Sequence, residues 1–190
     1  MKQKYKNMVG IALFTAIVLV LQFIGGGIKF GTFSISLVLV PIVVGAAVYG
    51  WKAGAFLGFI FGGAVLLSGD AAPFFALNPV ATVAVVLVKG TLCGLVAGLL
   101  YRVLERFNRY VAVIAAAVVC PIVNTGVFLL GCKLFFMPLV NEWAAALGFA
   151  DAGTYMIVGL VGVNFLIELG VNIVLSPAIV RIINYRKKSN

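Results

Sequence analysis

The sequence contains no histidine, only five acidic residues and three cysteines among its 190 residues. The cysteines Cys93, Cys120 and Cys132 lie in separate apolar runs without the two-residue spacing of a metal or redox site. The carboxylates form no close pair for acid–base chemistry, and no GxxxxGK[ST] phosphate-binding loop is present. We therefore expect no metal site, no cofactor, no ATPase site and no enzymatic activity in this chain.

Charge is scarce and apolar side chains are abundant. Hydrophobic residues make up 64% of the chain and charged residues 10%, whereas an ordinary soluble domain has roughly 45–50% and about 25%. A bilayer-spanning helix needs roughly 20 apolar residues. The fold class that we expect is an all-α integral membrane protein, a single transmembrane domain over residues 1–190. Its six helices are predicted at about 7–24, 34–49, 52–68, 79–105, 110–133 and 154–184.

The net charge of +9 is explained by topology. Six helices place both termini on one side, and Lys and Arg collect on the cytoplasmic side of membrane proteins. With cytoplasmic termini, most of the basic residues fall inside, and only Lys29 and Lys133 fall outside, with Lys89 within a helix. Nucleic-acid binding is therefore not expected. The apolar run at 7–24 is longer than the core of a typical signal peptide, so we expect a retained first helix.

Small residues recur every four positions in three of the predicted helices. Glycines do so at 50–62 and at 90–98, and Ala12 and Ala16 form a further pair. Such strips let helix backbones approach closely in lipid. We interpret the glycines as internal packing. For Ala12 and Ala16, internal packing and a docking strip for another membrane protein both stay open.

Several polar residues lie deep inside apolar runs. Lys89 is about 15 Å into its helix, and a lysine at that depth costs at least a few kcal/mol unless it faces the protein interior. Asn124 reaches a similar level, and Asn164 and Glu168 begin a stripe with a four-residue period. Two interpretations stay open. Lys89 and Glu168 form a structural ion pair, or these polar groups line a solvated cavity that opens to the outside.

The predicted outer loops supply further candidates. The segment 25–31 is rich in glycine and carries Lys29 and Phe30, as a mobile flap over a site requires. Asn78 ends the next outer segment, and Phe128 offers an apolar wall. The candidate substrate-binding residues are Lys29, Phe30, Asn78, Lys89, Asn124, Phe128, Asn164 and Glu168.

Several motifs in this order are similar to a known family. They are Ala12-Leu13-Phe14-Thr15-Ala16, the segments 36–42 and 49–55, Asn78-Pro79, Lys89-Gly90 and the segment 98–102. Over nearly its whole length the chain resembles the substrate-binding S component of energy-coupling factor (ECF) transporters, the vitamin importers of bacteria and archaea. The resemblance implies a six-helix bundle in a prokaryotic plasma membrane, with a vitamin site near the outer face that the first outer loop closes. It also implies that Ala12 and Ala16 contact a transmembrane coupling subunit, with two cytoplasmic ATPase subunits supplying the energy.

The resemblance does not identify the vitamin. The lysines favour a carboxylate-bearing molecule such as pantothenate, whereas the aromatic and amide side chains suit riboflavin, and both stay open. The alternative functions are a small secondary transporter or channel that uses Lys89 and Glu168 as an ion or proton relay, and a structural assembly subunit.

Overall fold

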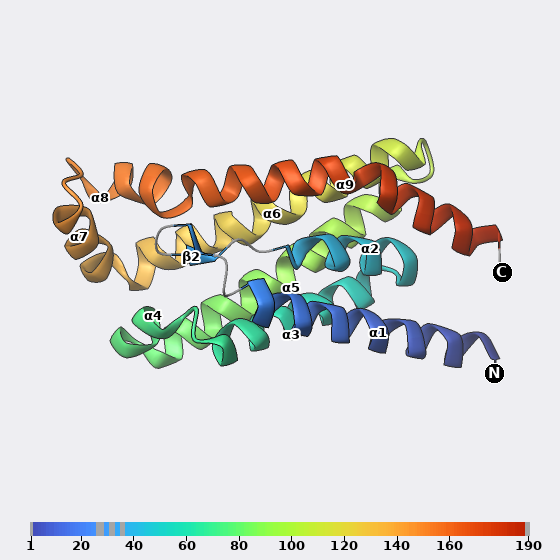
Figure 1. The fold of residues 1–190 in the computed structure, drawn as a ribbon, viewed down its shortest axis with the longest axis horizontal. Coiled ribbons are helices and arrows are strands. Elements are labelled where there is room, and N and C mark those ends of the chain that lie inside the picture. The colour runs from blue at the N-terminus through green and yellow to red at the C-terminus, as the bar shows by residue number, and fades with distance from the viewer. Residues whose placement is uncertain (1, 26–28, 31–32, 35–36, 189–190) are drawn as a thin grey trace.

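The structure, a computed structural model, describes residues 2–25, 29–30, 33–34 and 37–188, which form a helical bundle (Figure 1). Among these residues, five helical segments are long and apolar enough to cross a membrane. They are α1 (Lys2–Gly25), α3 (Trp51–Ser68), α5 (Pro79–Leu104), α6 (Arg109–Phe135), and the continuous run of α8 (Ala152–Thr154), η1 (Tyr155–Gly162) and α9 (Val163–Lys188). Helix α1 begins and α9 ends at the same end of the bundle (Figure 1).

The second predicted helix is shorter than expected. The sequence predicts it at 34–49, but α2 covers only Leu39–Tyr49. Ser34 belongs instead to strand β2 (Phe33–Ser34), which pairs antiparallel with β1 (Lys29–Phe30), and this pairing is incompatible with a helix that starts there. Eleven residues extend about 16 Å as a helix, roughly half of a hydrocarbon core. The described residues therefore contain five membrane-length helices and one half-length helix, rather than six full spans.

Glycine makes the sharp joint between α2 and α3. Gly50 alone separates the two helices and has a φ of +93°, a conformation that other residues rarely adopt. Two short helices, α4 (Ala72–Leu77) and α7 (Met137–Ala146), occupy the connections that follow α3 and α6. Helix α7 contains Trp143, and tryptophan favours the level of the lipid headgroups. Both short helices lie at the end of the bundle away from the start of α1 (Figure 1).

The glycine strips bring α3 and α5 into close contact, which confirms the packing interpretation. A Cβ atom on Gly58 would collide with the carbonyl oxygen of Gly90, and one on Gly54 would lie 2.5 Å from that of Gly94. Neither helix has room for even a methyl group along this seam. Because the backbones of α3 and α5 are in contact, neither helix can rotate, and the side chains on their other faces point in fixed directions.

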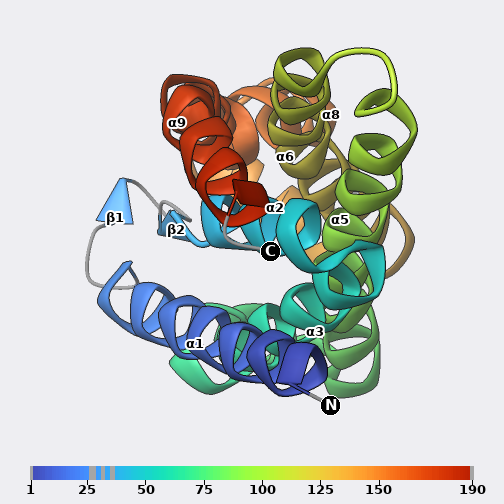
Figure 2. The same cartoon turned by 90° about the vertical axis from the view of Figure 1, so that its right-hand side faces the viewer.

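Apolar side chains form two separate clusters. The larger one lies among α1, α2, α3, α5, α6 and α9, and it contains Leu57, Phe61 and Ile179. The other lies at the α4 and α7 end and contains Phe74 and Phe136. Figure 2 shows the same bundle along its length, with α1 at the edge of the helix group. The residues of the candidate site lie between the two clusters.

Candidate substrate-binding site

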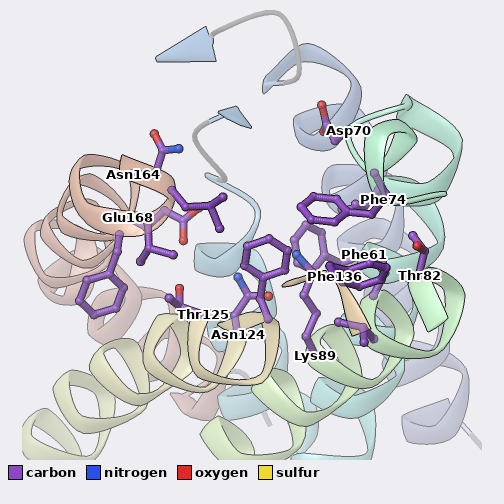
Figure 3. Close-up of a pocket in the computed structure, with 18 of the residues that line it drawn as sticks. Phe61, Asp70, Phe74, Thr82, Lys89, Asn124, Thr125, Phe136, Asn164 and Glu168 are labelled. Carbon is purple, nitrogen blue, oxygen red and sulfur yellow. The ribbon is translucent and has the colours of Figure 1, made fainter. Parts of the chain in front are cut away.

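A cavity lies between the two apolar clusters (Figure 3). It gives about 110 Å³ to the centres of water-sized molecules, whereas a single water needs roughly 10–15 Å³. Side chains of α1, α3, α4, α5, α6, η1 and α9 line it, together with the loop after α3. The polar lining residues are Gln22, Asp70, Thr82, Lys89, Asn124, Thr125, Asn164 and Glu168.

Lys89 enters the cavity from α5, between two aromatic rings. Its Nζ atom is 5.1 Å from the ring centroid of Phe128 on α6 and 5.9 Å from that of Phe61 on α3. Ring faces attract a cation at these distances, most strongly where water is scarce. The carboxylates of Glu168 and Asp70 are near enough for their charges to act on the ammonium group. The site therefore holds a cation between two aromatic rings and within reach of the charges of two carboxylates.

Helix α6 contributes Asn124, one turn before Phe128. The Asn124 side chain is 7% exposed, and its Oδ1 atom is buried without a hydrogen-bond partner. Figure 3 shows Asn124 and Lys89 reaching into the same space from neighbouring helices. Pro121 lies one turn earlier inside α6 and removes one backbone donor from the helix. A buried amide oxygen without a partner lowers the stability of the protein, and such groups are rare enough in folded proteins to need an explanation.

The polar stripe on α9 divides into two parts. Asn164 and Glu168 line the cavity. Further along, Asn172 donates from Nδ2 to the carbonyl of Glu168 at 2.8 Å, and Ser176 donates to the carbonyl of Asn172 at 2.9 Å. Asn172 and Ser176 therefore donate to the backbone of their own helix and do not line the cavity, while Oδ1 of Asn172 has no partner. The π-helix η1 ends just before Asn164, and π-helical turns are frequent at functional sites.

A hydrogen-bonded network ties α1 to the loop after α3 at the edge of the cavity. Gln22 donates from Nε2 to Oδ2 of Asp70 at 2.7 Å, and Ser68 donates to the same oxygen at 3.0 Å. Gln22 is 4% exposed. Gly69, between Ser68 and Asp70, has a φ of +83° and makes the turn that brings the two side chains together. This network fixes the position of α1 beside the cavity.

Aromatic side chains build the wall at the α4 and α7 end. Phe74 on α4 makes edge-to-face contacts with Phe136 at 5.0 Å, with Phe128 at 5.5 Å and with Trp143 at 5.6 Å between ring centroids. Such pairs stabilise by about 0.5–1.5 kcal/mol beyond the area that they bury. The wall shields the ring of Phe128 and so keeps the surroundings of Lys89 apolar.

The structure brings five of the eight predicted residues together. Lys89, Asn124, Phe128, Asn164 and Glu168 all line the cavity. Their role as ligand contacts stays a prediction.

The other three predicted residues are placed differently. Asn78 is the N-cap of α5, where its Oδ1 accepts a hydrogen bond from the backbone N–H of Ala81 at 3.1 Å, and it does not line the cavity. Lys29 and Phe30 form strand β1, but their side chains lie outside the described residues, as does most of the predicted flap at 25–31.

Gln22 and Phe61 were missed as site residues. Gln22 is a rare polar residue in the apolar run of the first helix, which is a signal that could have indicated it. Phe61 carries no such signal, since it looks like an ordinary apolar side chain in a sequence of this composition. Asp70 and Phe74, which also line the cavity, belong to the outer segment that ends at Asn78, which the sequence indicates as part of a lid.

Comparison with protein-family models decides the family. The model for the ECF transporter, substrate-specific component, matches residues 6–180. The chain belongs to this family. Substrate-specific (S) components are subunits of membrane transporters and are not enzymes. The apolar helices of this S component agree with a multi-pass membrane protein. Neither a curated protein nor a solved structure matches the chain.

Proposed function

We propose that this S component captures a water-soluble vitamin, of the pantothenate or the riboflavin type, from outside a prokaryotic cell and delivers it with an ATP-driven coupling module. The observation that carries the proposal is the convergence of Lys89, Asn124, Asn164 and Glu168 from three helices on one cavity. Binding proteins use a few polar groups at such positions in an apolar pocket to fix the orientation of a ligand. Binding, without bond making or breaking, is the chemistry that these groups support.

The coupling partners that we propose are a transmembrane subunit and two cytoplasmic ATPase subunits. The outer face of α1 supports a docking role, because Ala12 and Ala16 are both exposed on it. Neighbouring large side chains such as Val9 and Leu13 are also exposed, at 67% and 60%. Small residues among larger ones allow a partner helix to approach α1 closely in lipid.

Reconstitution tests this function. The full chain is placed in liposomes with and without a coupling module of the same organism, and uptake of radiolabelled pantothenate and riboflavin is followed with internal ATP. The proposal expects uptake of one vitamin only when both the module and ATP are present. Uptake driven by an ion gradient without the module would contradict it and favour the relay of Lys89 and Glu168. Absence of uptake for both vitamins would also contradict it.

A further inference from the structure

The hydrogen-bonding groups around the cavity indicate the chemical class of the ligand. This inference rests on the proposed function and concerns the same site. It starts from Lys89, whose ammonium group carries three N–H donors and no acceptor. Its ammonium group lies over the rings of Phe61 and Phe128, within range of the charges of Glu168 and Asp70. Ring faces stabilise the positive charge but are weak hydrogen-bond acceptors, so the donors stay available to a ligand.

Asn124 adds a second donor next to the first. Its Oδ1 is enclosed by protein and has no partner, so its contact with the cavity is through the amide nitrogen. The side chain is 7% exposed and is aimed at the space that Lys89 enters (Figure 3). An ammonium and an amide N–H₂ that converge from adjacent helices are complementary to the two oxygens of a carboxylate.

Two carboxylates lie near the cavity, on different elements. Asp70 already accepts hydrogen bonds from Gln22 and Ser68. Glu168 lines the cavity from α9, across from Lys89 (Figure 3), and its oxygens are acceptors. A ligand that places an acid group at Lys89 therefore meets an acceptor on the opposite side, which suits N–H or O–H groups.

We propose that the ligand is a monoanionic organic acid whose other polar groups are N–H or O–H donors, with its carboxylate bound by Lys89 and Asn124. The ligand is thus of the pantothenate type rather than the flavin type. A neutral flavin offers the ammonium group of Lys89 no anionic oxygen. The aromatic side chains Phe61, Phe74 and Phe128 then serve as walls for the apolar body of the acid.

Matched probes test the acid group. The purified full chain in nanodiscs, freed of bound ligand, is titrated by calorimetry with pantothenate, with riboflavin and with panthenol, in which an alcohol replaces the carboxylate of pantothenate. Pantothenate is expected to bind more tightly than panthenol by about tenfold or more, because only the acid makes charged hydrogen bonds. The preference should vanish in Lys89→Met and persist in Lys89→Arg. It should also persist in Lys133→Met, which removes an exposed lysine that does not line the cavity.

Asn124 gives a second, independent readout. Asn124→Leu removes the amide, whereas Asn124→Asp places a negative charge next to the proposed carboxylate site. Pantothenate should bind Asn124→Asp more weakly than Asn124→Leu, because like charges repel in a site of low dielectric constant. Elution volume and unfolding midpoint in detergent check that each variant is folded. A variant that fails this check is replaced by Thr125→Val, which alters the neighbouring lining residue and should weaken binding less than Asn124→Leu.

The outcomes separate the two proposals. Equal affinities for pantothenate and panthenol, riboflavin as the tight ligand, or no pantothenate binding would each overturn the acid assignment. ATP-driven uptake of riboflavin would overturn the acid assignment and leave the transport function standing. Tight pantothenate binding without uptake in the presence of the coupling module and ATP would leave the acid assignment standing and overturn the transport function.

Discussion

Gln22 shows how one polar residue positions a whole helix. It lies in an apolar stretch of α1, and its amide crosses to the carboxylate of Asp70 at 2.7 Å. Hydrogen bonds to charged groups stabilise by roughly 1.5–3 kcal/mol, about twice as much as neutral ones. Since both groups border the cavity, this bond couples the placement of α1 to the shape of the site.

Replacement of Gln22 by leucine should lower stability. The Gln22→Leu variant leaves the half-buried Asp70 with one donor fewer, so the free energy of unfolding of the protein should fall by about 1–3 kcal/mol. Thermal unfolding in detergent measures the change. Thr15→Val is the control, because the Thr15 hydroxyl donates to the carbonyl of Ile11 within its own helix. If both variants lower the free energy of unfolding by the same amount, the hydrogen bond between Gln22 and Asp70 contributes no more than a bond within one helix.

The residues of the candidate site were predictable where a polar side chain lies in the middle of an apolar run. A charged or amide side chain in the middle of an apolar run must face the protein interior, and Lys89, Asn124 and Glu168 all do so. It was harder to predict which polar residues on one face of a helix lie at the level of the cavity. Asn78 and Lys89 share a face of α5, but Asn78 is consumed as the N-cap of α5 and does not line the cavity. Asn172 extends the period of Asn164 and Glu168, yet it binds backbone.

At the scale of elements, glycines bring the backbones of α3 and α5 into close contact along one seam. The carbonyl oxygens of Gly90 and Gly94 occupy the places where Cβ atoms of Gly58 and Gly54 would lie. Sequence periodicity predicted these strips, because a four-residue repeat of glycine makes one smooth face. The start of α2 was not predictable in the same way, because no glycine or proline marks a boundary in the sequence between Phe33 and Leu39.

Replacement by alanine, which adds one methyl group, should affect stability at a glycine of the seam but not at a glycine outside it. Gly58→Ala should lower the free energy of unfolding by about 1–3 kcal/mol, because the new Cβ would push α5 away. Gly63→Ala lies in the same helix, and nothing is within 4 Å of its Cβ position, so stability should be unchanged or slightly increased. Denaturant or thermal unfolding of the two variants gives the comparison. Equal effects would show that the seam tolerates separation.

The stability of the protein should depend on pH through Asp151, the N-cap of α8, just before η1. Its carboxylate accepts hydrogen bonds from the side chain and the backbone N–H of Thr154, at 2.7 and 2.8 Å, and these bonds lower its pKa from the usual 3.8. A lowered pKa in the folded state means that the contribution to stability is present above the unfolded pKa. That contribution is lost as the pH falls through the folded value. Asp151→Ala should therefore lower the unfolding midpoint at pH 7, and the difference should shrink as the pH falls below 3.8. A difference that stays constant down to the acid limit of folding would contradict the capping role.

At the scale of the whole molecule, α1 presents a broad apolar face to its surroundings. Most of its large side chains are exposed, and Ala12 and Ala16 form a shallow strip among them. The cavity lies on the other side of α1, where Gln22 contributes to its lining. Ligand binding and partner docking thus use different faces of one helix, and a substitution can affect one without the other.

Tryptophan substitutions on α1 test this separation. Ala12→Trp combined with Ala16→Trp should leave ligand affinity unchanged and abolish ATP-driven uptake, because bulky side chains keep a partner helix away. The control is Val174→Trp with Ala178→Trp, an exposed pair with the same spacing on α9. Uptake that persists in the α1 variant, or that is lost equally in the α9 variant, would show that docking occurs elsewhere.

The central claim is that the cavity around Lys89 holds a small molecule that this S component carries. Mass spectrometry of the small molecules released on denaturing the purified protein tests it most directly, since tight binders often retain their ligand. We predict that wild type and Lys133→Met, incubated with pantothenate and washed, release it in amounts near one per chain. Lys89→Met should release almost none. Equal release from Lys89→Met and wild type, or none from wild type, would contradict the claim.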